Sequence, residues 1–146
     1  MLFTPMTRKA MSLAYNAHLG QTDISGVPYI LHPARVAAAF ETEAEACVAW
    51  LHDVVEDTDM TLQDIRLAGY GAVICDALEL LTHDKSVPYM DYIASIAENP
   101  VAKAVKLADL SDNMDTSRLI SIGEEDIERL EKYRRAFEFL TGQRAS

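Results

Sequence analysis

The stretch Leu51-His52-Asp53-Val54-Val55-Glu56-Asp57-Thr58 places four ionisable side chains directly after an apolar run. That run, residues 46–51, reads Ala-Cys-Val-Ala-Trp-Leu and favours a buried helix. Residues four apart share one face of a helix, so His52 is expected to lie over Glu56 and Asp53 over Asp57. Burying four such groups is costly unless a metal ion or other partners compensate their charge. The stretch therefore predicts a metal site at the end of a core helix.

Two other segments carry polar groups that could complete such a site. Residues 105–113 read Val-Lys-Leu-Ala-Asp-Leu-Ser-Asp-Asn, so a second apolar helix ends in a polar cluster, with Asp109 and Asn113 on one face. Residues 28–33 read Pro-Tyr-Ile-Leu-His-Pro, where Pro33 is expected to be the first helical residue and His32 the N-cap. Imidazole nitrogen together with carboxylate oxygen suits Mn, Fe or Zn better than Ca.

Composition places the chain among folded, acidic proteins. It has 146 residues, 49% of them hydrophobic, which is the size and balance of a single globular domain spanning residues 1–146. The formal net charge of -10 argues against a nucleic acid polymer as partner. No apolar stretch approaches the roughly 20 residues that span a bilayer, and the start lacks the features of a secretion signal. With Cys47 and Cys75 expected as free thiols, we predict a cytoplasmic protein without a membrane partner.

The hydrophobic pattern is helical almost throughout, and it predicts an all-α protein. No stretch of four or more residues alternates convincingly with the β-branched or aromatic enrichment of a strand. Thr61, with Asp64 three residues on, resembles a capping box at the start of another helix. Pro100 is expected in the first turn of a helix, and the last helix is expected to begin after Gly123. The remaining helices are expected over residues 5–19, 33–41, 44–55, 71–81 and 89–97.

Together these segments resemble a known enzyme family. His32, His52-Asp53 and Asp109 occur in the order H…HD…D that is typical of the HD-domain metal-dependent phosphohydrolases. The closer resemblance is to the (p)ppGpp hydrolase domain of the RelA/SpoT type, and the chain looks like its small standalone branch. That resemblance implies a compact bundle of helices. It is carried by residues 51–58, by Ala17-His18-x-Gly-Gln21, by Gly26-x-Pro28-Tyr29-Ile30-x-His32-Pro33 and by Val105-Lys106-Leu107-Ala108-Asp109-x-x-x-Asn113.

The resemblance also implies a role for each matching residue. One divalent ion, Mn in most of the family with Fe or Zn as alternatives, would be held by His32, His52, Asp53 and Asp109. Glu56 and Asp57 match the pair that positions and activates the attacking water. This fits their chemistry, because a carboxylate can take the proton of a water that a metal has acidified. Asn113 matches a residue that lies against the ribose and 3′ phosphates, and Lys106 is a second candidate for substrate binding.

At five positions this chain departs from the family pattern. Asp23 and Ile24 stand where the family commonly has Arg-Lys before the Gly-x-Pro-Tyr segment. Leu110 stands where Arg is common, Asp112 where His is common and Asp115 where Arg is usual. An anionic substrate such as ppGpp favours positive charge at such positions. We therefore expect a metal centre that matches the family pattern beside a substrate pocket that does not, to which Lys103, Lys106 and Arg35 could supply positive charge.

The sequence favours one function and leaves two others open. The first is a metal-dependent phosphohydrolase that releases pyrophosphate from (p)ppGpp. The second is an HD-domain phosphohydrolase acting on a less anionic nucleotide or a phosphomonoester. The third is a non-catalytic module that senses a nucleotide or binds a protein. The complete set of metal and water residues favours an enzyme whose partner is a nucleotide or another phosphorylated small molecule. The sequence leaves the oligomeric state open.

Two histidines fall outside the predicted ligand set. His18 is expected to pack the first helix against the site rather than to bind metal. His83 stands beside Asp84 and Lys85, a context that indicates an exposed loop.

Overall fold

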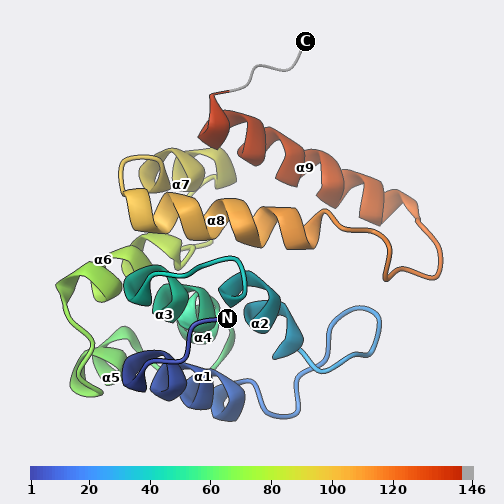
Figure 1. Cartoon of the computed structure of the whole chain (residues 1–146). Helices are drawn as coiled ribbons and strands as arrows, with labels where there is room; N and C mark the ends of the chain where they lie inside the picture. Colours follow the sequence, from blue (N-terminus) through green and yellow to red (C-terminus); the bar gives the residue numbers. More distant parts are fainter. Residues whose placement is uncertain (143–146) are drawn as a thin grey trace.

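The computed structural model describes residues 1–142, and this part of the chain is all-α, as the sequence predicts (Figure 1). Within it, β structure is limited to one isolated bridge between Thr22 and Pro28. No helix in the described range is both long and apolar enough to cross a membrane. The helices are α1 (Pro5–Ala17), α2 (Leu31–Ala37), α3 (Glu43–Leu51), α4 (Val54–Asp57), α5 (Leu62–Leu67), α6 (Ala72–Leu81), α7 (Tyr89–Ile96), α8 (Pro100–Asn113) and α9 (Glu124–Thr141).

The sequence signals for the starts of α5 and α8 are confirmed. At α5, the Asp64 N–H donates to Thr61 Oγ1 at 3.1 Å and the Thr61 N–H donates to Asp64 Oδ2 at 2.9 Å, which is a complete capping box. Pro100 is in the first turn of α8, where Asn99 caps the Ala102 N–H. Local side-chain chemistry therefore fixes where these helices begin.

The helix predicted over residues 44–55 is interrupted at the site. α3 ends at Leu51 and α4 begins at Val54, so His52 and Asp53 occupy the turn between them. His52 Nδ1 donates to the Ala49 carbonyl at 2.6 Å, an acceptor that a continuous helix would give to the Asp53 N–H. This side-chain competition for a backbone acceptor accounts for the break, which the hydrophobic pattern does not reveal.

The predicted start of α2 is also wrong. The helix begins at Leu31, two residues before Pro33, and its N-cap is Ile30. His32 is therefore inside the first turn rather than at the cap. Proline is tolerated there because the first N–H groups of a helix have no partner within the helix. The shift places the His32 side chain on the buried side of α2.

Helix α3 forms the centre of the fold. Every residue from Ala46 to Leu51 is buried, as expected for a helix that is apolar on all sides. It packs against α1, α2, α6 and α8, and α9 covers the far side of α8 (Figure 1). The buried free thiols of Cys47 and Cys75 belong to this core. This packing brings the end of α3 close to both α2 and α8.

The central position of α3 makes Leu51 a sensitive point for stability. Leu51 is fully buried, so Leu51→Ala is expected to lower the free energy of unfolding by about 2–5 kcal/mol. Leu67→Ala is the matched control, because Leu67 is 76% exposed and its truncation should change stability by no more than about 0.5 kcal/mol. Urea unfolding followed by circular dichroism measures both. Equal losses in the two variants would contradict the assignment of α3 to the core.

Candidate metal centre and adjoining pockets

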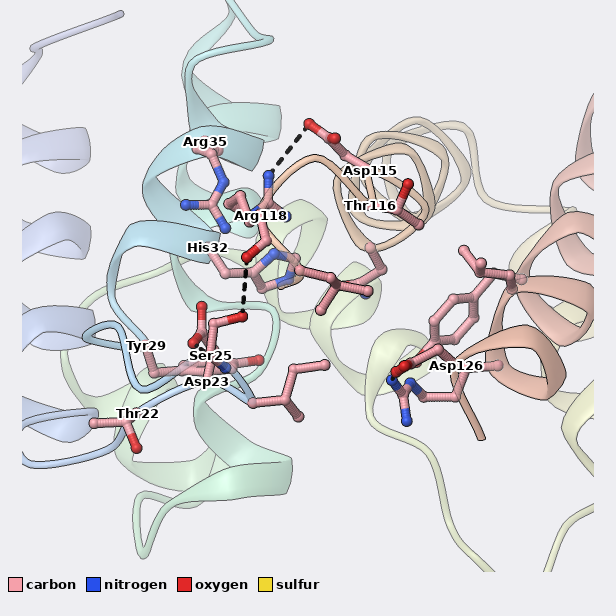
Figure 2. A pocket seen from close by; sticks show the side chains of 16 residues that line it. Thr22, Asp23, Ser25, Tyr29, His32, Arg35, Asp115, Thr116, Arg118 and Asp126 are labelled. Atoms are coloured by element: carbon pink, nitrogen blue, oxygen red, sulfur yellow. Dashed lines mark hydrogen bonds and ion pairs between the residues drawn. The ribbon is translucent and has the colours of Figure 1, made fainter. Parts of the chain in front are cut away.

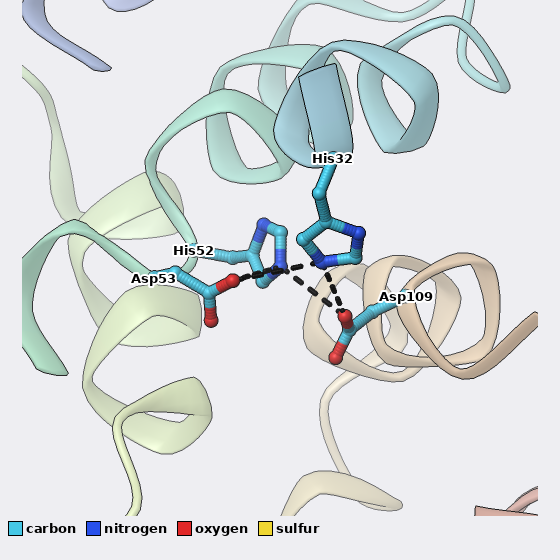
Figure 3. A group of neighbouring side chains, drawn as sticks. All are labelled: His32, His52, Asp53 and Asp109. Atoms are coloured by element: carbon cyan, nitrogen blue, oxygen red, sulfur yellow. Dashed lines mark hydrogen bonds and ion pairs between the residues drawn. The ribbon is translucent and has the colours of Figure 1, made fainter. Parts of the chain in front are cut away.

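The structure brings the four predicted metal ligands together. His32 comes from α2, His52 and Asp53 from the turn between α3 and α4, and Asp109 from α8 (Figure 3). One potential ligand atom from each of the four residues lies within 4.8 Å of all the others. Both imidazoles and the Asp109 carboxylate are buried, while Asp53 is partly exposed.

The spacing of these atoms suits one divalent ion. His32 Nε2 is 2.9 Å from Asp109 Oδ1, and His52 Nε2 is 3.0 Å from Asp53 Oδ2. The other two His–Asp separations, His52 to Asp109 and His32 to Asp53, are 3.4 and 3.6 Å. Nitrogen and oxygen ligands bind such ions at about 2.0–2.2 Å, which puts neighbouring ligand atoms about 3 Å apart. The group can therefore surround a single ion.

The tautomer of His52 supports the same conclusion. Its Nδ1 faces the Ala49 carbonyl, which only accepts hydrogen bonds, so Nδ1 carries the proton. The opposite nitrogen, Nε2, is buried without a hydrogen-bond partner in residues 1–142, although it faces the carboxylates of Asp53 and Asp109. An imidazole lone pair directed at two carboxylates needs a cation between them. The donor set thus fits a metal ion.

Neighbouring charges keep the Asp109 carboxylate ionised. Burial alone would raise the pKa of Asp109, but the Lys106 ammonium holds it well below its usual value. Lys106 Nζ donates to Asp109 Oδ2 at 2.9 Å, and Asn113 Nδ2 donates to Oδ1 at 3.0 Å. An ionised carboxylate is the form that binds a metal.

A second layer of side chains orients Asp53. The Tyr29 hydroxyl donates to Asp53 Oδ2 at 2.5 Å. The His18 ring packs against Tyr29 with 4.9 Å between ring centroids, and His18 Nδ1 is 2.9 Å from Gln21 Oε1. His18 therefore packs the end of α1 against the site, as the sequence predicts.

One pocket borders the metal centre on the side of α4, and we call it the lysine pocket. Its volume is about 320 Å³, and its cationic residues are Lys85, Lys106 and Lys132. Lys132 Nζ lies 4.2 Å from the centroid of the Tyr89 ring, whose buried hydroxyl has no hydrogen-bond partner in the described part of the chain. Lys85 and Lys132 were not predicted from the sequence, because neither belongs to a motif.

Glu56 and Asp57 also line the lysine pocket, next to His52 and Asp53. Glu56 Oε1 accepts from the backbone N–H of His83 at 2.8 Å. Partial burial of the Asp57 carboxyl, with the negative charges of Asp53 and Glu56 nearby, raises its pKa to about 6. The two predicted water-activating carboxylates are therefore in the same cavity as the metal centre.

His83 lies in the loop between α6 and α7, as the sequence predicts, but it is less exposed than expected. The side chain is partly buried, and its ring stacks on Tyr92 with 4.4 Å between centroids. The flat face of Tyr92 gives the imidazole an apolar partner that sequence neighbours do not reveal. His83 thus forms part of the wall of the lysine pocket.

A second pocket, of about 360 Å³, adjoins the first, and we call it the arginine pocket (Figure 2). Its cationic side chains are Arg35 from α2, Arg118 from the loop after α8 and Arg129 from α9. His32 reaches this pocket from the metal centre. Both pockets are lined by Tyr29, Asn113 and Tyr133, so they meet at the metal centre.

Comparison with known proteins identifies the family. None of the established protein-family profiles matches the chain. The mouse guanosine-3′,5′-bis(diphosphate) 3′-pyrophosphohydrolase MESH1 is 36% identical over 129 residues, which are 79% of this chain and 72% of the mouse protein. The chain belongs to this pyrophosphohydrolase family. Human MESH1 is 39% identical over 103 residues, which cover 63% of this chain and 57% of the human protein.

Other members of the pyrophosphohydrolase family are longer. The Vibrio cholerae enzyme is 34% identical over 124 residues, so the match covers 75% of this chain but only 17% of the relative. Among solved structures, a metazoan ortholog of SpoT that hydrolyses ppGpp superposes with a TM-score of 0.78 at 25% identity. That match covers 99% of this chain and 90% of the other.

The structure revises how the departures from the family pattern affect the pocket. Leu110 is fully buried in the core, so this position does not line either pocket. Asp112 accepts hydrogen bonds from His32 and Arg35, and Asp115 is 3.3 Å from the Arg118 guanidinium. Their negative charges are therefore largely offset. The remaining two positions, Asp23 and Ile24, also line the arginine pocket. Neither forms an ion pair with a basic side chain within residues 1–142.

The metal centre predicts a defined binding stoichiometry. The purified chain, stripped with chelator, is expected to bind one Mn²⁺ per molecule, and excess Mn²⁺ at 100 times the dissociation constant should stabilise it by about 2.7 kcal/mol. Asp53→Asn should weaken binding at least about tenfold, because a neutral amide replaces a ligating carboxylate. Asp76→Asn, on the exposed side of α6, is the matched control. Equal Mn²⁺ affinity of the two variants in calorimetry would refute this ligand set.

Proposed function

We propose that this chain removes the 3′-pyrophosphate of ppGpp or pppGpp by metal-dependent hydrolysis, leaving GDP or GTP. The observation that carries the proposal is the position of the His/Asp group between two cation-lined pockets. Such an arrangement suits a substrate with anionic groups on both sides of the bond that breaks. Membership of the pyrophosphohydrolase family supports this choice of substrate. Mn²⁺ is the ion implied by the resemblance of the sequence to that family.

The two pockets suggest an orientation for the substrate. The lysine pocket offers the ammonium groups of Lys85 and Lys132, together with the free hydroxyl of Tyr89, to the 3′-pyrophosphate that leaves. The arginine pocket offers Arg118 and Arg129 to the nucleoside and its 5′ phosphates. Asn113 lines both pockets, which agrees with its expected position against the ribose and 3′ phosphates.

The proposed site also supplies the groups that hydrolysis needs. A divalent ion held by the His/Asp group would offset the charge that develops on phosphoryl oxygens and would make water more acidic. Asp57 is the proposed general base, since a carboxyl group with a pKa of about 6 is ionised at neutral pH and can accept a proton. Glu56, fixed by the His83 N–H, is proposed to orient the attacking water.

One observation favours a second candidate substrate. The carboxylates of Asp23, Asp115 and Asp126 line the arginine pocket together with its guanidinium groups. Because these carboxylates partly neutralise the positive charge of the arginine pocket, they favour a nucleotide with fewer 5′ phosphates than ppGpp carries. Hydrolysis rates for ppGpp and for a nucleoside 3′-phosphomonoester, measured at equal concentration, distinguish the two candidates.

Activity is expected to depend on both the metal and Asp57. The chain loaded with Mn²⁺ should release pyrophosphate and GDP from ppGpp, and chelator should abolish this release. Asp57→Asn should lower kcat by about 10²–10⁴-fold while Mn²⁺ remains bound, because the loss is that of a general base. Asp59→Asn, two residues further on and exposed, is the matched control. An active Asp57→Asn variant would exclude Asp57 as the base, and an inactive chain with Mn²⁺ bound would exclude ppGpp as the substrate.

The raised pKa of Asp57 predicts a pH dependence. Below a pKa of about 6 the carboxyl group is protonated and cannot accept a proton, so kcat should fall about tenfold for each pH unit below that point. The measurement is kcat between pH 5 and pH 8, with bound Mn²⁺ followed by electron paramagnetic resonance at each pH. A kcat that stays constant down to pH 5, with the ion bound, would contradict the assignment.

A further inference from the structure

Asp112 connects the metal centre to the arginine pocket. This residue of α8 lies between two side chains of α2, and its own side chain is only 11% exposed. Its Oδ2 accepts from His32 Nδ1 at 2.7 Å, and its Oδ1 accepts from Arg35 Nε at 2.7 Å. Arg35 Nη2 donates to Oδ2 at 3.1 Å, which makes the Arg35–Asp112 contact bidentate.

The contact with Asp112 determines which nitrogen of His32 is free. The Arg35 guanidinium donates to both oxygens of Asp112, the geometry of a contact with an ionised carboxylate. An ionised carboxylate only accepts hydrogen bonds, so His32 Nδ1 must carry a proton. The other ring nitrogen, Nε2, is the one that lies 2.9 Å from Asp109 and faces the metal centre.

The two imidazoles of the centre are therefore oriented by different acceptors. His52 Nδ1 donates to a neutral backbone carbonyl of its own helix, that of Ala49. His32 Nδ1 donates to a carboxylate on a different helix, α8, which also carries the ligand Asp109. A carboxylate is the stronger acceptor, and it makes the opposite nitrogen of the ring a better electron donor to a metal.

We propose that Asp112 is a positioning residue for His32, holding its ring and tautomer so that Nε2 faces the metal, and that Arg35 fixes Asp112 in turn. The contact also joins α2 to α8 at the point where both helices contribute ligands. Arg118, 3.7 Å from Asp112 Oδ1, adds further positive charge, so the carboxylate brings little net negative charge to the arginine pocket. This inference depends on the proposed metal site and is independent of which substrate is hydrolysed.

The test is the affinity of the full chain for Mn²⁺, measured by electron paramagnetic resonance. Asp112→Ala removes the acceptor and is expected to weaken Mn²⁺ binding by about 10–100-fold. Asp112→Asn keeps an oxygen for the Nδ1 proton, and it should recover about half of that loss on a logarithmic scale, because a neutral acceptor is roughly half as strong. Circular dichroism confirms that each variant is folded.

Asp115→Ala is the matched control for charge. Asp115 is also paired with Arg118 and lies three residues further along, but it makes no contact with His32 among the interactions of residues 1–142. Its removal takes away the same charge and should leave the Mn²⁺ affinity within about twofold. An Asp112→Ala variant that binds Mn²⁺ as tightly as the unmodified chain would overturn the proposal. The proposal is also overturned if Asp115→Ala weakens Mn²⁺ binding as much as Asp112→Ala does, or if Asp112→Asn binds Mn²⁺ no more tightly than Asp112→Ala.

These outcomes are separate from the test of the proposed function. If the unmodified chain binds Mn²⁺ but does not hydrolyse ppGpp, the substrate assignment fails, and the affinities of the Asp112 variants still decide the role of Asp112. If the unmodified chain binds no Mn²⁺, both the metal site and the positioning role are refuted.

Discussion

The buried charge of Asp109 is the constraint on which the rest of the site depends. A carboxylate at the centre of a helical core is tolerated only if cations and donors surround it. Here Lys106 and Asn113 donate to it from its own helix, and the two imidazoles approach from α2 and from the turn after α3. The break between α3 and α4 and the early start of α2 both serve this purpose, since they turn His52 and His32 toward Asp109.

The side chains that face the metal centre are in turn hydrogen-bonded to groups further from it. Each group that faces the centre is held by a further contact: Tyr29 donates to Asp53, His52 donates to a backbone carbonyl, and Asp112 accepts from His32. The last of these contacts reaches the surface through Arg35, which lines the arginine pocket. Although the whole chain has a formal net charge of -10, Lys and Arg side chains line both pockets beside the centre, interspersed with acidic ones. These ammonium and guanidinium groups can pair with an anionic ligand despite the overall negative charge.

Helix α9 shows how a mostly exposed helix contributes to a site. It packs on α7 and α8, and it buries only Ala136 and Leu140 completely. Its sequence gives a strong signal for the helix itself, with acidic residues in the first turn, and none for a function. Yet Arg129 lines one pocket, Lys132 lines the other and Tyr133 lines both. A charged residue on an amphipathic helix is usually solvated, and only the placement of α9 over the metal centre gives these three residues a common role.

Sequence patterns predicted the helical class, several helix starts and the four His and Asp residues that the structure brings together. Helix periodicity and capping depend on residues that are close in sequence, and the H…HD…D order follows a family pattern. Which cations line the pockets, and which side chains Asp112 contacts, depend on tertiary packing. Sequence spacing places residues only relative to their own helix, whereas Arg35 and Asp112 meet across 77 positions. A carboxylate that was expected to repel an anionic substrate is instead bound to an imidazole and a guanidinium, because α2 and α8 pack side by side.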